Sequence, residues 1–417
     1  MKRTAALIIG AGQAGLATSR HLTDRGVDHV VLERDAIATR WRTERWDSLR
    51  LLTPNWQTRL PGWSYGGPEP DGFMRAVELA DHLQRYAASF DAPVRCGVSV
   101  VRVEHASDRW RVTTNEDTWL VDDVIVATGQ ASRAHVPPMS AGAPVGIDHI
   151  TPNAYRGPDQ LGPGGVLVVG ASASGAQIAD ELAGAGRAVT LAVGGHHRMP
   201  RTYRGADIMT WLDRIGHFDE VLSDVPGESP RGADRSLQLV GSSDRHDLDL
   251  ARLHHGGVRL VGRMTALYNG RAVFADDLGA NIVDSDARLH RLLAHIDARA
   301  CLAADTTAIP QSLSWLGRGP RCESLDLRRE GIGTIVWATG FRRDHSCLPQ
   351  GVLDKDGELR HRHGITECPG LYAVGFRRQR TRKSTFVDGV GADAAVVVHH
   401  LLTRPRLRRT TAFGEVA

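Results

Sequence analysis

Residues 1–35 constrain the fold of this chain more than any other stretch. A short apolar segment at residues 4–9 is followed by a glycine-rich turn at residues 10–15, a helical segment to residue 25 and a second apolar segment at residues 27–32. A strand, a glycine turn, a helix and a second strand in this order form a dinucleotide-binding βαβ unit. The sequence therefore predicts an α/β fold that begins with a nucleotide site.

The three glycines of this turn have separate tasks. Gly10 permits the tight turn out of the strand, Gly12 lets the backbone approach a pyrophosphate, and Gly15 lets the helix pack closely on the strand. The helix N-terminus offers its free N–H groups to the phosphates. Glu33 stands where a carboxylate can accept hydrogen bonds from a ribose. A signal peptide is the alternative, but glycines and charged residues interrupt the apolar run.

The overall composition excludes several classes of protein. The chain has 417 residues, of which 41% are hydrophobic and 24% charged, and this suits two or three globular domains. The net charge of +3 is small and no basic stripe with interleaved aromatic residues occurs, so we expect no nucleic-acid binding. Five scattered cysteines without a CxxC pair argue against disulfides, a metal site and a redox dithiol, and favour the cytoplasm. No apolar run is long enough for a membrane helix.

The opening pattern occurs a second time from residue 165. A strand at residues 165–169, a glycine turn at residues 170–175 and a helix precede a strand that ends at Val193, in the position of Glu33. An acid there would repel a 2′-phosphate, whereas a neutral residue before a basic cluster would accept one. The second site should therefore prefer NADPH, with Arg198 as the first choice for the phosphate contact and Arg201 behind it.

Three further stretches bear on the site. Residues 40–56 contain three tryptophans without a clear period, which fits either a loop that covers a flat ligand or packing beneath the domain. Two apolar strands, at residues 123–129 and 334–340, end in Ala-Thr-Gly, where glycine allows a close approach to a ligand. A glycine-rich turn from Asp388 opens the last apolar helix, so its N–H groups can meet a ligand.

Two glycine turns 160 residues apart, two strands ending in Ala-Thr-Gly and a late glycine-opened helix together resemble the flavoproteins with two dinucleotide-binding domains. Within these, the chain is most similar to the flavin-containing monooxygenase group, including bacterial members related to plant YUCCA-type enzymes. The resemblance implies an α/β fold with two Rossmann-like domains of the three-layer ββα type. The FAD domain would comprise residues 1–136 and 331–417, with an NADPH domain, residues 137–330, inserted into it.

The same resemblance implies an activity. FAD reduced by NADPH would react with O2 to a C4a-(hydro)peroxyflavin, which passes one oxygen atom to a nitrogen or sulfur centre of a small molecule. Asn55 and Trp46 are the expected catalytic residues. The alternatives are an NAD(P)H:acceptor oxidoreductase or oxidase without oxygen transfer, a Baeyer-Villiger-type oxygenation, and a nucleotide-binding regulatory protein. A homodimer is left open.

The residues expected to contact the cofactors come from both repeats and from the strand ends. They are Gly10, Gly12, Gln13, Ala14, Gly15, Glu33, Arg34, Trp41, Arg42, Ala127, Thr128, Gly129, Gly170, Ser172, Ser174, Gly175, Arg198, Arg201, Gly340, Asp388 and Gly391.

The chain departs from the group at its fingerprint FxGxxxHxxx(Y/F), expected before the second glycine turn. With Tyr155 at the last position, the phenylalanine, glycine and histidine positions hold Val145, Ile147 and Thr151. This departure bears on how NADPH oxidation is coupled to oxygenation more than on cofactor binding.

Overall fold

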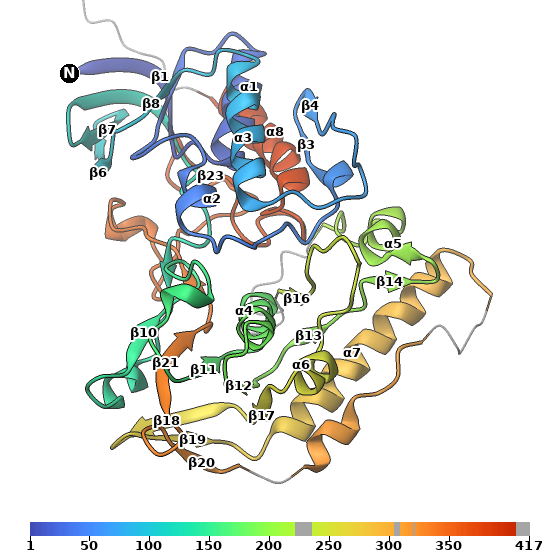
Figure 1. Ribbon diagram of the computed structural model, residues 1–417. Coiled ribbons are helices and arrows are strands. Elements are labelled where there is room, and N and C mark those ends of the chain that lie inside the picture. The colour runs from blue at the N-terminus through green and yellow to red at the C-terminus, as the bar shows by residue number, and fades with distance from the viewer. Residues whose placement is uncertain (222–235, 304–308, 320–321, 406–417) are drawn as a thin grey trace, which may run out of the picture.

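The fold consists of two units that each contain a parallel sheet, seen one above the other in Figure 1. The structure is a computed structural model and describes residues 1–221, 236–303, 309–319 and 322–405. Most strands of the first sheet come first in the sequence, and the strands of the second sheet follow. The last strand, β23, pairs again with the first sheet, and the last helix, α8, packs on it. One unit is therefore inserted into the other.

The sheet of the first unit has the strand order β5-β2-β1-β8-β7-β6, and β23 also pairs with β8. Its parallel part consists of β1 (Lys2–Ile9), β2 (His29–Leu32), β5 (Val94–Arg95), β8 (Thr118–Val126) and β23 (Leu371–Ala373). The antiparallel part consists of β6 (Val100–Ala106) and β7 (Arg109–Thr114). These strands confirm the predicted βαβ start.

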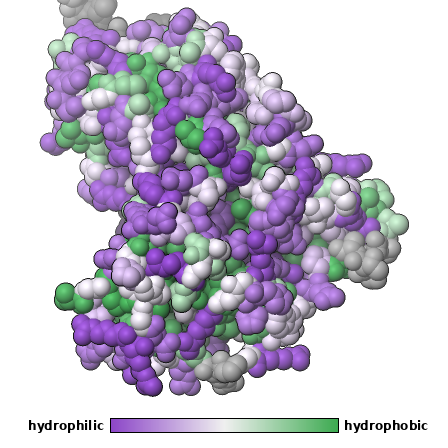
Figure 2. Space-filling model, in the orientation of Figure 1, coloured by the Kyte–Doolittle hydropathy of each residue, from purple (hydrophilic) through white to green (hydrophobic). Residues whose placement is uncertain are grey.

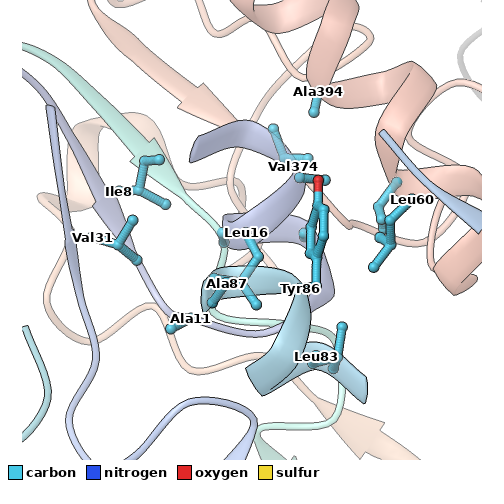
Figure 3. Packing of buried hydrophobic residues seen from close by; sticks show 14 of the residues in the cluster. Ile8, Ala11, Leu16, Val31, Leu60, Leu83, Tyr86, Ala87, Val374 and Ala394 are labelled. Atoms are coloured by element: carbon cyan, nitrogen blue, oxygen red, sulfur yellow. The ribbon is translucent and has the colours of Figure 1, made fainter. Parts of the chain in front are cut away.

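Three helices cover one face of this sheet: α1 (Gln13–Thr23), α3 (Ala76–Ala88) and α8 (Val387–Thr403). Their side chains meet in a core in which Leu16, Tyr86 and Ala394 lie close together, as Figure 3 shows. The other face is covered by Val103 and Trp110 of the antiparallel hairpin. The first unit therefore has the layers β, β and α, and the N-terminal and C-terminal helices pack side by side (Figure 1).

The sheet of the second unit is wholly parallel, with the order β10-β21-β11-β12-β17. These strands are β10 (Asp148–Ile150), β21 (Ile332–Trp337), β11 (Gly165–Val169), β12 (Val189–Ala192) and β17 (Arg259–Val261). Helices α4 (Ala173–Gly184) and α6 (Leu250–His255) pack on one face. The antiparallel strands β18 (Met264–Tyr268), β19 (Arg271–Phe274) and β20 (Ser324–Asp326) pack on the other, so the layering repeats.

Strand β21 lies outside the predicted inserted segment, which was expected to end at residue 330. It pairs with β11 and β10 along its length, so the second sheet extends to Trp337. The two chain crossings between the units then pair with each other, as β9 (Arg133–Ala134) and β22 (Phe341–Arg342). The crossing points therefore lie side by side.

The remaining elements are short, apart from α7. They are α2 (Thr39–Thr43), η1 (Asn55–Gln57), β3 (Arg59–Leu60), β4 (Trp63–Ser64), η2 (Pro138–Gly142), η3 (Pro158–Gln160), β13 (His197–Arg198), β14 (Thr202–Tyr203), β15 (Ala206–Asp207), α5 (Ile208–Arg214), β16 (Leu237–Gln238), α7 (Leu278–Arg299), η5 (Ser314–Arg318) and η6 (Gln350–Val352). Hydrophilic residues cover most of the face drawn in Figure 2, with apolar residues in small groups between them. Within the described ranges, no helix is both long and apolar enough to cross a membrane.

Candidate functional site

The first glycine turn connects β1 to α1 and has the geometry that its sequence predicts. Gly10 has φ +107°, and a Cβ atom there would lie 2.7 Å from the carbonyl oxygen of Ala127. A Cβ atom on Gly15 would lie 1.8 Å from the carbonyl oxygen of Gly10, so neither position admits a side chain. A Cβ atom on Gly12 would meet nothing within 4 Å. The turn is therefore tight on the protein side and open where a pyrophosphate would approach.

Glu33 follows β2 at the same edge of the sheet. Its Oε2 atom accepts a hydrogen bond of 2.8 Å from the N–H of Ala11, inside the glycine turn. Its Oε1 atom accepts a longer one, 3.3 Å, from the N–H of Asp35. A carboxylate has about four lone-pair sites, so these bonds leave Glu33 with capacity for ribose hydroxyls. The acid thus supports the turn as well as standing where a ribose can reach it.

The second glycine turn connects β11 to α4 and reproduces the first. Gly170 has φ +108°, and a Cβ atom on Gly175 would lie 1.8 Å from the carbonyl oxygen of Gly170. Ser172 caps α4 without a hydrogen bond from its own side chain, which leaves the N–H groups of the first helical turn to a ligand. Val193, at the position of Glu33, is fully buried, so its side chain offers no contact to a ribose.

Arg198 does not face the second turn. Its side chain is buried, with Nη1 2.9 Å from Asp286 and Nε 3.1 Å from Asp249, and Nη1 also donates to the carbonyl oxygen of Gln311 at 2.8 Å. These contacts contradict the expectation that Arg198 binds a 2′-phosphate, because two carboxylates already neutralise its charge. They hold β13 against α7 and the segment that follows it.

Arg201 is also a structural residue. It is fully buried, pairs with Asp207, donates 2.8 Å to the carbonyl oxygen of Leu52 and lies 4.9 Å from the ring centre of Phe73. Burial lowers its pKa, and Asp207 opposes this effect. The expected phosphate contact is contradicted here too, because the side chain instead joins the second unit to the loop around residues 52–73 of the first.

The sequence analysis missed Arg263, which follows β17 at the carboxyl edge of the second sheet. Its side chain is 60% exposed and lines a cavity beside the second turn, and it lies 3.4 Å from the carboxylate of Asp277. A Cβ atom on Gly194, directly after Val193, would lie 3.7 Å from its Nε atom. The sequence position of Arg263 was the signal that could have found it. Arg263 follows β17, the parallel neighbour of β12, and the carboxyl ends of neighbouring parallel strands meet at one edge of the sheet.

A cavity of about 900 Å³ lies between the two units. The second glycine turn and Arg263 line it from one side, Trp41 and Trp46 from the other. The crossings contribute Gln130 and residues 338–341, which include the predicted Gly340. The size suits a nicotinamide together with a small substrate.

The tryptophan-rich loop packs against both units and also lines this cavity, while its place over a flat ligand stays a prediction. Trp41 Nε1 donates 3.3 Å to Oε1 of Gln13 in the first helix, which ties the loop to the first glycine turn. Trp46 is buried in the core of the second unit together with Tyr155. The loop therefore spans from one nucleotide turn to the other unit.

Asn55 is buried, and its side chain holds its own loop. Its Nδ2 donates 2.9 Å to the carbonyl oxygen of Glu69, and its Oδ1 accepts 2.7 Å from the N–H of Met74. These bonds give Asn55 a structural task, and its catalytic role stays a prediction. Nearby, Oε1 of Gln57 and Oγ1 of Thr58 are buried, and no residue of the described ranges forms a hydrogen bond with them.

Four other predicted cofactor residues have protein partners. Asp388 accepts bonds of 2.6 and 2.8 Å from Arg59 and one of 3.2 Å from Lys383. Arg42 bonds to Asp81 and Gln84 of α3, and Arg34 to Asp35 and Glu44. The carbonyl oxygen of Thr128 accepts a hydrogen bond from Arg40, while Oγ1 of Thr128 is buried and has no partner in the part of the chain that the structure describes. Arg42 thus faces α3 rather than the glycine turn.

The residues present fit two dinucleotides. The first turn offers an open backbone edge at Gly12 and an acid for a ribose, and buried polar atoms of Gln57, Thr58 and Thr128 lack partners among the described residues. The second turn offers an uncapped helix N-terminus and an exposed arginine instead of an acid. This is the donor set that FAD and NADPH respectively require.

The degenerate fingerprint ends at the junction of the two units. Tyr155 is fully buried and its hydroxyl donates 2.8 Å to Glu181, whereas Val145 is 95% exposed and makes no pocket wall. Burial, with Glu181, raises the pKa of Tyr155. The next residue, Arg156, donates from one guanidinium to carbonyl oxygens on both sides of the junction, namely those of Thr43, Arg45, Asn153 and Tyr155.

Two repeated dinucleotide turns, the second of which lines a cavity between inserted α/β units, define a flavin- and pyridine-nucleotide-dependent oxidoreductase. The family model described as pyridine nucleotide-disulphide oxidoreductase matches residues 7–214. An oxidoreductase of Geobacillus kaustophilus, named as uncharacterized and CzcO-like, is 29% identical over 95% of this chain and 97% of its own. The probable indole-3-pyruvate monooxygenase YUCCA1 of Arabidopsis thaliana is 33% identical over 89% of this chain and 85% of its own.

A solved structure agrees with these relatives in fold. The flavin-containing monooxygenase from Stenotrophomonas maltophilia has a TM-score of 0.67 and 19% identity, covering 96% of this chain and 99% of its own. The chain belongs to the flavin-containing monooxygenase group, and it is a flavin-dependent monooxygenase that uses FAD and NADPH. The expected fold class and cofactors are confirmed.

Proposed function

We propose that this flavin-dependent monooxygenase oxygenates a nitrogen or sulfur atom of a small molecule, with O2 as the co-substrate. The observation that carries the proposal is the lining of the cavity. None of its lining residues, all from the described part of the chain, is a histidine, lysine, cysteine or tyrosine. A cavity without such groups suits a substrate that is already nucleophilic, such as a thioether or an amine, because no base is needed to activate it.

Glu358, the one carboxylate of the lining, is a weak candidate for a base. It pairs with Arg343 and lies 3.6 Å from Nε2 of His345, and these partners lower its pKa to about 2. A carboxylate with so low a pKa accepts a proton poorly near neutral pH. The absence of a thiol in the lining also argues against disulfide reduction at this cavity.

We assign FAD to the first unit and NADPH to the second. Gly10, Gly12 and Gly15 would hold the FAD pyrophosphate at the start of α1, with Glu33 on the ribose. Gly170, Gly175 and the N-terminus of α4 would hold the NADPH pyrophosphate. When bound, FAD supplies the redox chemistry, accepting a hydride from NADPH and activating O2. The FAD domain would then comprise residues 1–136 and the chain after Trp337.

We assign the 2′-phosphate of NADPH to Arg263. Its guanidinium is exposed beside Gly194, and its partner Asp277 is 3.4 Å away, so a phosphate can compete for its N–H groups. Trp41 and Trp46 would exclude water from the reacting atoms and orient the substrate between them. Asn55 would act indirectly, by holding the loop that continues from the tryptophans.

Oxygenation beside a carbonyl is the competing chemistry. The relative that is 33% identical, YUCCA1, is named as a probable indole-3-pyruvate monooxygenase, and indole-3-pyruvate is a 2-oxo acid. The same cavity also carries several arginines, which suits a carboxylate. One assay with both kinds of substrate separates the two.

The test measures O2 consumption, NADPH oxidation and hydrogen peroxide for the purified holoenzyme with a panel of thioethers, tertiary amines and 2-oxo acids. We expect O2 uptake with little peroxide, and a sulfoxide or N-oxide that carries label from ¹⁸O2, for at least one thioether or amine. If only the 2-oxo acids give a labelled product, the enzyme oxygenates beside a carbonyl group and the proposed nitrogen or sulfur oxygenation is wrong. Full peroxide release with every substrate would indicate an oxidase.

A further inference from the structure

Arg45 occupies an unusual place in the wall of the cavity. It lies between Trp41 and Trp46 in the sequence, and all three side chains line the cavity. Its guanidinium carbon lies 5.0 Å from the ring centre of Trp41, and its Nη1 donates 2.6 Å to the carbonyl oxygen of Glu44. A guanidinium stacked on an aromatic ring keeps its in-plane N–H groups for other acceptors.

In the described part of the chain, Arg45 has no close counter-ion. Among the residues that the structure describes, no carboxylate lies within 4.0 Å of it. The adjacent acid, Glu44, is engaged with Arg34 at 3.4 Å and Arg40 at 3.6 Å. Burial lowers the pKa of Arg45 to about 10; the charge of Glu44 opposes this effect, and Arg40 and Arg156 add to it, so Arg45 stays charged at neutral pH. Arg45 is half-buried, and a partly desolvated cation without a close counter-ion is costly, which points to an anion that the site receives.

The main chain that carries Arg45 is fixed rather than free to adjust. Arg156 donates to the carbonyl oxygens of Thr43 and Arg45, and its own carbonyl oxygen accepts 2.9 Å from the N–H of Asp47. These bonds tie the loop to the second unit on both sides of Arg45. The guanidinium is therefore presented to the cavity by a braced loop.

We infer that Arg45 is an anion-binding residue of the cavity, where it receives either a carboxylate of the substrate or the pyrophosphate of NADPH. A planar guanidinium bonds to both groups through two parallel N–H···O contacts. The inference rests on the proposed function only in that both ligands would occupy this cavity. It needs no oxygenation to be tested, because binding to the oxidised holoenzyme is sufficient.

The experiment compares wild type, Arg45→Gln and a matched control, Arg102→Gln, by isothermal titration. Arg102 is an exposed residue of β6 that pairs with Glu104. The probes are NADPH, (phenylthio)acetate and its uncharged amide, (phenylthio)acetamide. FAD content and the melting temperature report the fold of each variant. Should Arg45→Gln lose FAD, Arg45→Met, which keeps the packing of the stem on Trp41, replaces it.

The expected result is a loss of at least about tenfold in affinity for one anionic probe in Arg45→Gln, with binding of the amide unchanged. A loss confined to (phenylthio)acetate assigns the site to the substrate, and a loss confined to NADPH assigns it to the pyrophosphate. Unchanged affinity for both anions in folded Arg45→Gln overturns the inference. If wild type does not bind (phenylthio)acetate, the titration with NADPH alone decides. An NADPH affinity that is the same in wild type and Arg45→Gln then also overturns the inference.

Discussion

Nη1 of Arg198 lies 2.9 Å from Oδ1 of Asp286, and both side chains are buried. Arg198→Ala would leave Asp286 and Asp249 as buried carboxylates without their cation. Breaking a buried pair in this way costs about 3–5 kcal/mol. We expect urea denaturation to show a loss of this size. The ratio of NADPH to NADH affinity should stay as in wild type, and a stable variant that had lost its preference for NADPH would contradict this assignment.

Arg263→Ala should weaken NADPH and spare NADH. One hydrogen bond to a charged group is worth about 1.5–3 kcal/mol, which is roughly a 10- to 100-fold change in affinity. The measurement is the dissociation constant of each nucleotide. Arg259→Ala, which removes an exposed arginine of β17 that is paired with Glu330, is the control. Equal effects on both nucleotides would exclude a contact with the 2′-phosphate.

Gly15→Ala and Gly175→Ala should separate the two nucleotide sites. Each Cβ atom would lie 1.8 Å from a carbonyl oxygen of the same turn, so the turn must open. We expect Gly15→Ala to lose FAD, and Gly175→Ala to keep FAD while NADPH no longer reduces it. Flavin content and anaerobic reduction measure this. Gly184→Ala, at the other end of α4, meets nothing within 4 Å and should behave as wild type.

Arg156→Lys should loosen the tryptophan loop. A lysine ammonium cannot reach the four carbonyl oxygens that one guanidinium fork bridges. We expect a higher ratio of peroxide released to NADPH oxidised, with the affinity for NADPH little changed, because water would enter the cavity. A lower melting temperature with an unchanged peroxide ratio would limit Arg156 to a role in stability.

His82→Phe should flatten the pH dependence of stability. His82 is buried and burial lowers its pKa from 6.5 to about 4, so the folded protein resists a proton that the unfolded chain accepts. The free energy of unfolding should therefore fall as the pH drops from 6.5 towards 4, by up to about 1.4 kcal/mol per pH unit for this histidine. Denaturation at several pH values should show that slope reduced in the variant. Burial also lowers the pKa values of His217 and His361, so these two histidines should keep part of the pH dependence in the variant.

Both glycine turns were predictable because their constraints are local. The contacts that require glycine at positions 15 and 175 come from Gly10 and Gly170, five residues earlier. The strands around them follow from short apolar runs, and the parallel sheets follow from the βαβ order. Glu33 lies beside the first turn and the buried Val193 takes its position in the second unit, while the different nucleotide preference that this implies stays a prediction.

The roles of Arg198 and Arg201 could not be predicted, because their partners lie far away in the sequence. Arg198 is held by Asp249 and Asp286, which lie 51 and 88 residues further along the chain. Arg201 is held partly by the carbonyl oxygen of Leu52, 149 residues earlier. A basic cluster looks the same in sequence whether its charges face a phosphate or buried acids. Strand β21 was assigned to the wrong unit on similar grounds, since an apolar strand does not specify its sheet.

The sequence alone determined that this chain has two nucleotide turns, that one carries an acid and the other does not, and that FAD and NADPH are its cofactors. The tertiary structure decided which cations remain available to ligands. Long-range ion pairs neutralise Arg198 and leave Arg263 exposed beside the second turn, while the brace from Arg156 sets Arg45 in the cavity wall. The physical reason is that a charge is free or paired according to what folding brings within about 4 Å of it.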